Sequence, residues 1–358
     1  MPRVHGKVLL VGSVPLDTPE EVFRLCGDTV GDLVTSLPDG EQGYRRQWIN
    51  MLAARIYSDT PWLESYTRPK TAEGEEGWDP TGYDDHWMFT VRPGAPRYRL
   101  KHLGYLDDAK RSYASFCALR DEGVIPEGVR FQISLPATES ATRWFTTSAQ
   151  DYAILYDAYE EAMDRELAAI FTAIPADDLV IQWDICMETL SIESNDQRAG
   201  LSQWKAPGEP FDRYVRALRS LSAKVIPDVP MGLHLCYGDL HHKHLVEPKD
   251  LSVCVRMANA AFDKARRSID FVHVPVPRDR HDDAYFRPLQ DLHGGDARLF
   301  LGLVHTTGGL DGCLRRAEAA SRYAADFGIA TECGLGRRSP ETIPGLMRLH
   351  REVADRLS

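Results

Sequence analysis

Long apolar runs and basic clusters are both missing from the 358-residue sequence. No apolar run approaches the ~20 residues that a membrane-spanning helix needs. The Arg pairs, such as Arg266-Arg267 and Arg337-Arg338, are short, and the formal net charge is -11. A nucleic-acid-binding protein normally carries a basic patch, because its partner is a polyanion. We therefore expect no membrane span and no nucleic-acid partner.

A disulfide framework and a dinucleotide-binding motif are missing as well. The 7 cysteines are odd in number and show no repeated spacing. The N-terminus has no signal-peptide pattern, so we expect reduced thiols and a cytoplasmic protein. No GxGxxG follows the first predicted strand, which disfavours an open, doubly wound nucleotide-binding sheet. These absences leave a protein that acts on small molecules, with homo-oligomerisation left open.

The composition that remains is that of an ordinary globular protein. Hydrophobic residues make up 43% and charged residues 27%, which is ample material for a core. The length suits one α/β barrel with insertions or two smaller domains. Buried-strand segments alternate with helical segments, and this order favours a (β/α)8 TIM barrel. We predict one such domain over residues 1–358, with strands near residues 7–11, 32–37, 129–135, 179–184, 231–235, 268–273, 299–305 and 328–334.

The stretch from about residue 60 to 100 differs from its surroundings. It is rich in Trp, Tyr, Pro and Gly, with Trp78 and Trp87 near its middle. Long insertions in barrel loops often carry function. We predict an insertion in the loops of the C-terminal face that contains a small hairpin and acts as a lid. The alternative is a structural excursion that packs on the outside.

One short stretch, Met231 to Asp239, combines a buried strand with two metal-binding side chains. Side chains alternate along a strand, so His234 and Cys236 point to the same face. An imidazole and a thiol on one face can bind one zinc ion. The alternative is a core histidine beside a buried free cysteine, because an HxC spacing alone is a weak signal.

Three later predicted strands also end in a metal ligand or a proton carrier. These residues are His273, His305 and Cys333. In a parallel barrel the carboxyl ends of the strands meet at one face, where active sites lie. We therefore expect the three side chains to converge with His234 and Cys236.

Six short motifs at the strand ends, taken in this order, resemble those of the catalytic barrel of cobalamin-independent methionine synthase. They also place the chain in the wider superfamily that includes uroporphyrinogen decarboxylase. The resemblance runs over nearly the whole chain but is strong only at the motifs. The motifs are Val11-Gly12-Ser13, Asp39-Gly40-Glu41, Ile181-Gln182-Trp183-Asp184, His234-Leu235-Cys236-Tyr237, Val304-His305-Thr306 and Glu332-Cys333-Gly334-Leu335.

The resemblance implies a zinc site. His234, Cys236 and Cys333 match three zinc ligands of the family. The fourth family ligand is a Glu at the end of the sixth strand, and His273 stands in that place here. Histidine is a good zinc ligand, so the resemblance implies a His2Cys2 site. A structural zinc with four closed ligands is the alternative.

The resemblance also implies roles in substrate binding and catalysis. Glu41 and Asp184 match acids that hold the amino group of homocysteine, and we also expect Asp184 to act in catalysis. Ser13 matches a contact to the substrate carboxylate. His305 matches a histidine proposed to handle protons near the metal. The alternative for the two acids is an ion pair with a protein arginine such as Arg45 or Arg46.

Departures from the family lie at the methyl-donor end of the site. We expect no counterpart of the family's second, N-terminal barrel. The stretch that holds the folate-stacking Trp reads Ser134 to Thr138 and then Arg143-Trp144-Phe145, and the family's DEP reads Asp184-Ile185-Cys186. We therefore do not expect a polyglutamyl folate donor.

Together these residues predict a zinc-dependent methyl- or alkyltransferase. It would activate a small, homocysteine-like thiol as a zinc-bound thiolate for attack on an alkyl donor. Its partners would be that small-molecule thiol and a methyl or alkyl donor. The alternative is a zinc-dependent lyase or hydrolase that uses metal-activated water. A third reading is a barrel that binds a metal or small ligand without catalysis.

Overall fold

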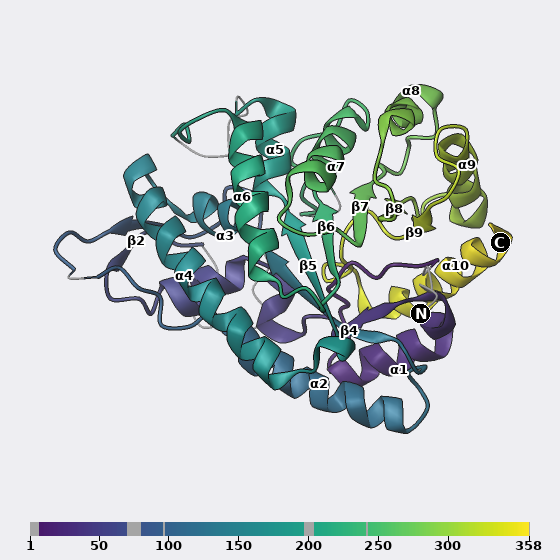
Figure 1. Cartoon of the computed structure of the whole chain (residues 1–358), viewed down its shortest axis with the longest axis horizontal. Coiled ribbons are helices and arrows are strands. Elements are labelled where there is room, and N and C mark those ends of the chain that lie inside the picture. Colours follow the sequence, from purple (N-terminus) through teal and green to yellow (C-terminus); the bar gives the residue numbers. More distant parts are fainter. Residues whose placement is uncertain (1–6, 70–79, 96, 197–203, 241–242, 358) are drawn as a thin grey trace.

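Strands and helices alternate around a central parallel sheet (Figure 1). The computed structural model describes residues 7–69, 80–95, 97–196, 204–240 and 243–357. Within these residues, 7 parallel strands neighbour one another in the order β1-β4-β5-β6-β7-β8-β9. Their bounds are β1 Ser36–Pro38, β4 Arg130–Pro136, β5 Leu179–Ile185, β6 Met231–Leu235, β7 Phe271–Pro275, β8 Arg298–Gly302 and β9 Gly328–Ile329.

The N-terminal segment completes the barrel. Val8 forms a parallel bridge with Ile329 of β9. The amides of Lys7 and Val8 donate to the Leu33 carbonyl, just before β1, at 2.7 and 3.0 Å. This segment lies between β9 and β1 and takes the eighth position of the barrel. The fold is therefore the predicted TIM-type barrel, and its closure excludes the open doubly wound sheet.

Glutamine side chains inside the barrel bind the backbone of this first segment. Gln132 Nε2 donates to the Leu10 carbonyl at 3.0 Å, and Gln182 Nε2 donates to the Val11 carbonyl at 2.6 Å. Both glutamines are buried. A buried carbonyl without a donor costs free energy, so these bonds stabilise a segment that has few ladder bonds of its own. They also fix the position of Ser13 at the mouth of the barrel.

The parallel register places three titratable side chains on neighbouring strands. Asp184 of β5 is aligned with His234 of β6, and His234 is aligned with His273 of β7. Two residues earlier, Gly232 has no side chain, and a Cβ there would lie 2.1 Å from the Phe271 ring. The ring therefore fills the barrel at that level, below the polar layer. The apolar cluster at this level comprises Leu9, Val11, Val180, Phe271, Phe300 and Ala330.

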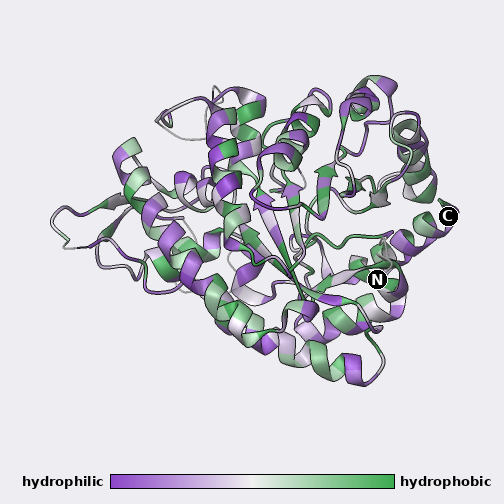
Figure 2. Ribbon diagram, viewed as in Figure 1, coloured by the Kyte–Doolittle hydropathy of each residue, from purple (hydrophilic) through white to green (hydrophobic). Residues whose placement is uncertain are grey.

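Helices cover the outside of the sheet (Figure 1). Their bounds are α1 Pro19–Val30, α2 Tyr105–Asp121, α3 Thr138–Thr142, α4 Ala149–Ala173, α5 Met187–Ser194, α6 Pro210–Lys224, α7 Ser252–Lys264, α8 Asp283–Phe286, α9 Gly309–Ser321 and α10 Ile343–Arg356. In Figure 2 they carry both hydrophilic and hydrophobic residues, as helices with one buried face do. Helix α1 begins as predicted. The Thr18 hydroxyl accepts from the Glu21 amide at 3.2 Å, and Pro19 occupies the first turn.

Two strands end earlier than predicted. The strand expected over residues 299–305 ends at Gly302, and the one expected over residues 328–334 ends at Ile329. The chain beyond β9 crosses directly over Gly302, where a Cβ would lie 2.7 Å from the Glu332 Cα. The two segments are joined once more beyond the strand ends, where the Val304 amide donates to the Ala330 carbonyl at 2.9 Å. His305 and Cys333 therefore lie in loops beyond their strands.

The insertion contains the predicted hairpin, at the left of Figure 1. Strand β2 (Leu63–Thr67) pairs antiparallel with β3 (Met88–Val91). Trp87, next to β3, is buried. Trp78 lies outside the described residues. The hairpin is thus a folded unit beside the barrel, and its action as a lid stays a prediction.

The segment before β3 is fastened to the loop that follows β6. The Tyr83 hydroxyl donates to the Lys243 carbonyl and accepts from the Leu240 amide, both at 3.0 Å. The Tyr83 ring also meets the Trp144 ring edge-on, with centroids 6.3 Å apart, and His86 lies 4.9 Å from Trp144. The insertion therefore contacts loops from two different strand ends.

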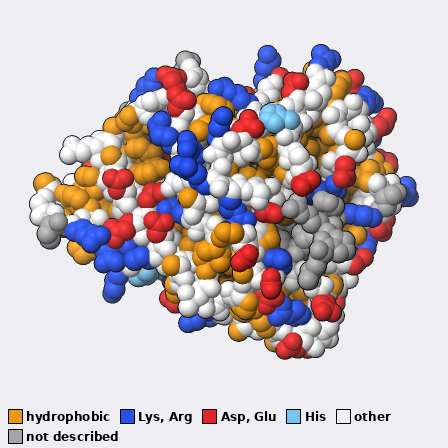
Figure 3. Space-filling view, viewed as in Figure 1, with side chains coloured by type: hydrophobic (Ala, Val, Ile, Leu, Met, Phe, Trp, Pro, Cys, Tyr) orange, Lys and Arg blue, Asp and Glu red, His pale blue; other side chains and the backbone are white. Residues whose placement is uncertain are grey.

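None of the described helices is both long and apolar enough to cross a membrane. On the face shown in Figure 3, Lys and Arg side chains are interspersed with Asp and Glu. Charge on this face is therefore mixed in sign.

Candidate metal centre and cavity

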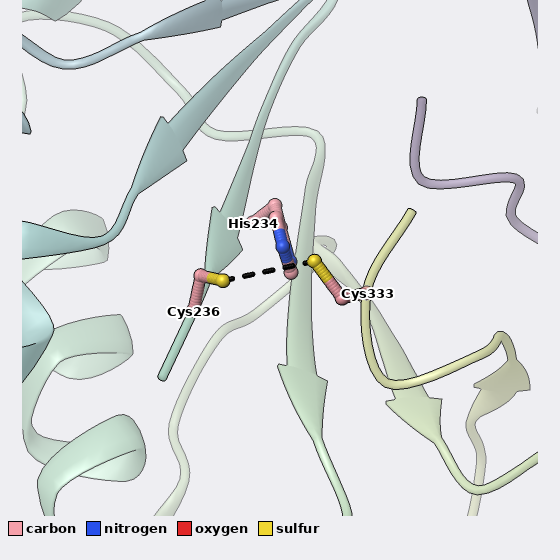
Figure 4. Close-up of side chains that lie close together, drawn as sticks. All are labelled: His234, Cys236 and Cys333. Carbon is pink, nitrogen blue, oxygen red and sulfur yellow. Dashed lines mark hydrogen bonds between the residues drawn. The ribbon is translucent and has the colours of Figure 1, made fainter. Parts of the chain in front are cut away.

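Three of the predicted ligands meet at the mouth of the barrel. His234 lies on β6, Cys236 lies just beyond it, and Cys333 comes from the loop after β9 (Figure 4). Their candidate ligand atoms all lie within 4.8 Å of one another. The two Sγ atoms are 3.8 Å apart. This separation suits two thiolates on one zinc ion, because Zn–S bonds are about 2.3 Å long and the coordination is tetrahedral.

Hydrogen bonds determine which nitrogen of His234 is free. His273 Nε2 lies 3.0 Å from the Thr331 carbonyl oxygen, which can only accept. His273 Nε2 therefore carries the proton, and its Nδ1 accepts from His234 Nδ1 at 2.7 Å. His234 Nε2 is left with a lone pair. That atom is buried and has no hydrogen-bond partner in the described part of the chain.

Both histidine rings are held neutral. Burial, and next the neighbouring His273 ring, lower the pKa of His234 well below its ordinary value. Burial lowers the pKa of His273 to about 3. A neutral imidazole is the form that binds a metal. His273 differs from the other predicted ligands because both of its ring nitrogens are already engaged.

The pKa values of the two thiols are raised, whereas those of the histidines are lowered. Hydrogen bonding with Cys186, together with burial, raises the pKa of Cys236 well above that of an ordinary cysteine. Hydrogen bonding with Cys236, together with burial, raises the pKa of Cys333 in the same way. Adjacent buried thiols resist ionisation unless a cation is present, and a coordinated metal ion deprotonates them. Two thiols and an imidazole with a bare, unpartnered nitrogen fit zinc.

The three ligands line a cavity of about 980 Å³, which includes its open mouth. Ser13, Glu41 and Asp184 line the same cavity. Among the other lining residues are Arg46, Trp48, Tyr83, His86, Trp144, Cys186, Met187, Leu190 and Arg337. A small molecule that enters this space can reach both the candidate ligands and the two acids.

The two cavity acids are held in an unfavourable environment for charge. Burial, and next the nearby Asp184, raise the pKa of Glu41 to about 8. Burial raises the pKa of Asp184 to about 7. Glu41 also has a positive φ of 53°, which L-residues adopt only at a cost and mostly at functional sites. An added positive charge in the cavity would lower both pKa values and stabilise the carboxylate forms.

The charge of Arg45 lowers the pKa of Glu41 in part, but Arg45 does not pair with either cavity acid. Its guanidinium pairs with Asp39 at 2.7 Å and with Asp108 at 3.4 Å. Within the described residues, neither Glu41 nor Asp184 forms an ion pair. The Asp184 carboxylate accepts a hydrogen bond from Gln182 Nε2 at 2.9 Å, and hydrogen bonding with Gln182 and Trp48 lowers its pKa in part. The alternative of a structural Arg45 pair therefore has no support in this geometry.

Ser13 and His305 occupy different settings. The Ser13 hydroxyl oxygen lines the cavity and accepts from the Gly336 amide at 3.1 Å. Its proton remains available to a ligand. His305 is buried outside the cavity lining, where its Nε2 donates to the Val276 carbonyl at 2.7 Å. Burial lowers the pKa of His305 to about 4, and its proton-handling role stays a prediction.

Several cavity residues were not anticipated as such from the sequence. Trp48 and Tyr83 stand outside the six motifs and face the site only because their loops fold over the barrel mouth. Cys186 has a weak signal, since it stands two residues after Asp184. Arg337 has one too, since it follows Cys333 by four residues.

Comparison with known proteins adds one finding. No family model matches the sequence, and no protein of curated function matches it. The fold matches a B12-independent methionine synthase from Shewanella sp. W3-18-1, solved in complex with selenomethionine, with a TM-score of 0.57. The alignment covers 99% of this chain and 97% of that chain at 13% identity. This chain has the methionine synthase barrel fold.

The resemblance predicted from the motifs is thus confirmed at the level of the fold. A methyltransferase from Methanosarcina mazei is also similar, at 13% identity over 96% of this chain and 94% of that chain, with a TM-score of 0.48. At such identities the comparison establishes the barrel and leaves the chemistry to be argued from the site.

The raised pKa of Asp184 predicts a pH-dependent cost to stability. Its pKa rises on folding from 3.8 to about 7, so the folded protein holds a proton that the unfolded chain has already released. Stability therefore falls as the pH rises through this window and is level above it. Asp184→Asn should remove the part of the fall that comes from Asp184, leaving the part from Glu41, and should make the variant more stable than wild type at about pH 8, by on the order of 3 kcal/mol. Urea unfolding of the metal-free proteins across this pH range measures the difference.

Asp178→Asn is the matched control for this experiment. Arg120 lowers the pKa of Asp178, so that variant should lose stability relative to wild type as the pH rises. A difference between Asp184→Asn and wild type that stays constant with pH would show that Asp184 is compensated in the folded protein.

Proposed function

We propose that this protein is a zinc-dependent methyl- or alkyltransferase that activates a small thiol. The observation that carries the proposal is the bare, buried Nε2 of His234 beside two thiols at a cavity that also holds two unpaired carboxyl groups. Soft donors, an open space and groups for a cationic substrate occur together there.

The ligand set leaves room for a substrate atom. His234 Nε2 and the thiolates of Cys236 and Cys333 are three donors, and three protein ligands with an open fourth position are typical of catalytic zinc. Two thiolates balance the charge of Zn²⁺. Zinc supplies a Lewis acid that lowers the pKa of an incoming thiol, which makes it a nucleophile at neutral pH.

Glu41 and Asp184 supply recognition of an ammonium group. Two buried carboxylates facing one cavity repel each other, and each is costly without a cation. A substrate ammonium between them would favour both charged forms and hold the thiol end at a set distance from the metal. A thiol that carries an amino group, such as homocysteine, meets this requirement.

The cavity walls would exclude water from the reacting atoms. Tyr83 and His86 from the insertion and Trp144 from the loop after β4 contact one another. With Trp48 and Met187 they give the space an apolar and aromatic lining. Alkyl transfer to a thiolate is faster when the nucleophile is not hydrated. We propose this side of the cavity for the alkyl donor, with the insertion as a lid.

The metal is the first test. We expect about one zinc ion per chain, lost in Cys236→Ser and Cys333→Ser because each removes one thiolate of the set. Cys26→Ser is the matched control, since Cys26 is a buried free cysteine outside the cavity. Elemental analysis gives the zinc content, and assays with methyl donors and thiols give turnover.

Turnover that requires a thiol supports transfer. Turnover of the zinc protein with no thiol present would indicate a lyase or hydrolase that uses water. A metal-free protein with full activity would contradict the proposal.

The cavity acids are the second test. Asp184→Asn and Glu41→Gln should each lower kcat/KM for an amino-bearing thiol, because each removes a partner of a charge pair. The expected loss of transition-state stabilisation is on the order of 2–4 kcal/mol for each variant. Zinc content should stay unchanged. Glu188→Gln is the matched control, since Glu188 is buried next to this region and does not line the cavity. Near-wild-type kinetics in both cavity variants would remove the amino-bearing substrate from the proposal.

The third test concerns the role of His273. This residue is either the fourth zinc ligand or the residue that orients the His234 ring. We propose orientation: His273 accepts the Nδ1 proton of His234 and so directs Nε2 to the metal. His273→Gln retains an acceptor and a donor, whereas His273→Leu retains neither. We expect the Leu variant to lose roughly 10–100-fold in zinc affinity and the Gln variant much less. X-ray absorption at the zinc edge should count one imidazole in wild type, and a count of two would establish His273 as a ligand.

A further inference from the structure

The loop after β9 carries both a metal ligand and an arginine to the cavity. It is bound tightly to the first segment of the barrel: the Leu335 amide donates to the Ser13 carbonyl at 2.6 Å, and the Gly336 amide donates to the Ser13 hydroxyl oxygen at 3.1 Å. A Cβ at Gly336 would lie 2.9 Å from Ser13, so only glycine allows this approach. The position of Arg337 relative to Cys333 is thereby fixed by the backbone.

Arg337 is a half-buried cation at the cavity. It lines the space that His234, Glu41 and Asp184 also line. Its Nε is buried and makes no hydrogen bond, and its guanidinium forms no ion pair with any residue that the structure describes. A guanidinium has five N–H donors, and a buried donor without an acceptor costs free energy.

Two of the fully buried arginines are paired with carboxylates, whereas a third, Arg316, donates to the backbone carbonyls of Leu303 and Arg278. Arg143 binds Glu139 at 2.7 Å and Asp196 at 3.0 Å. Arg213 binds the same two carboxylates at 3.1 Å each. Arg337 is half-buried and has no such carboxylate partner among the described residues, so its guanidinium is open to an anionic group that enters the cavity.

We propose that Arg337 is the anion-binding residue of the cavity and that the thiol substrate carries a carboxylate, sulfonate or phosphonate group. This inference rests on the proposed function and names its substrate class. The planar fork of the guanidinium matches two oxygens of such a group. The Ser13 hydroxyl proton is the neighbouring donor. Anion recognition is thus assigned chiefly to Arg337, whereas the sequence motifs pointed to Ser13 alone.

The charges of the site agree with such a ligand. Glu41 and Asp184 take an ammonium, Arg337 takes an anion, and the metal takes the thiol. The three groups stand on loops or strand ends from different parts of the barrel, so a ligand held by all three has one orientation. Arg337 also lowers the pKa of Glu41, which agrees with its position close to that acid.

The test compares thiols that differ only in their second group. Zinc replaced by Co²⁺ gives an absorption spectrum that changes when a thiol binds the metal, so dissociation constants are measured without turnover. The probes are 2-mercaptoethanol, 3-mercaptopropionate, 2-mercaptoethanesulfonate, 2-mercaptoethylphosphonate and homocysteine. Wild type, Arg337→Gln, Arg337→Lys and the control Arg338→Gln are compared, since Arg338 does not line the cavity.

We expect wild type to bind at least one anionic thiol about tenfold or more tighter than 2-mercaptoethanol, the usual worth of a charged hydrogen bond. Arg337→Gln should abolish this preference, and Arg338→Gln should keep it. In turnover, Arg337→Gln should raise KM with little change in kcat. The ranking of the three anions identifies the group that the site takes.

Two results would overturn the inference. If anionic and neutral thiols bind wild type equally, or if Arg337→Gln keeps the preference, then Arg337 has no role in anion binding while thiol activation stands. If no thiol of any charge perturbs the Co²⁺ spectrum, the proposed function itself fails and this inference with it.

Discussion

The in-register alignment of β5, β6 and β7 is the constraint on which the site depends. Parallel pairing places Asp184, His234 and His273 at one level, facing the same way. One level below, the Phe271 ring fills the space that Gly232 leaves free, so the interior beneath the polar side chains is apolar. A shift of one residue in any of these strands would turn its side chain to the other face. The bare nitrogen of His234 is thus a product of strand pairing as much as of residue type.

Closure of the barrel brings the remaining groups to the same mouth. The first segment has little ladder of its own and is held by Gln132 and Gln182 from inside. Ser13 at the end of this segment then binds the loop that carries Cys333 and Arg337. A polar barrel interior is therefore a condition for assembling the site, because an apolar interior would leave the carbonyls of Leu10 and Val11 without donors.

The charged groups of the cavity lower the folding stability of the protein when no ligand is bound. Among the described residues, neither the half-buried Glu41, the buried Asp184 nor Arg337 forms an ion pair, and the adjacent thiols resist ionisation. Elsewhere the chain satisfies such groups: Arg143, Arg213, Glu139 and Asp196 form a closed network. Unsatisfied groups collected in one cavity are typical of binding sites, where the ligand supplies the missing partners.

The sequence by itself indicated the barrel, because alternating strands and helices allow few other closures. It also indicated His234 and Cys236 as candidate ligands, because alternation along one strand puts them on one face. It also indicated Cys333, Glu41 and Asp184 through their motifs. Only the tertiary structure decided that His273 binds His234 through its ring, that His305 is turned to the Val276 carbonyl, and that Arg337 faces the cavity. Those outcomes depend on loop paths and on hydrogen bonds between segments far apart in the chain, and local sequence patterns carry no information about such contacts.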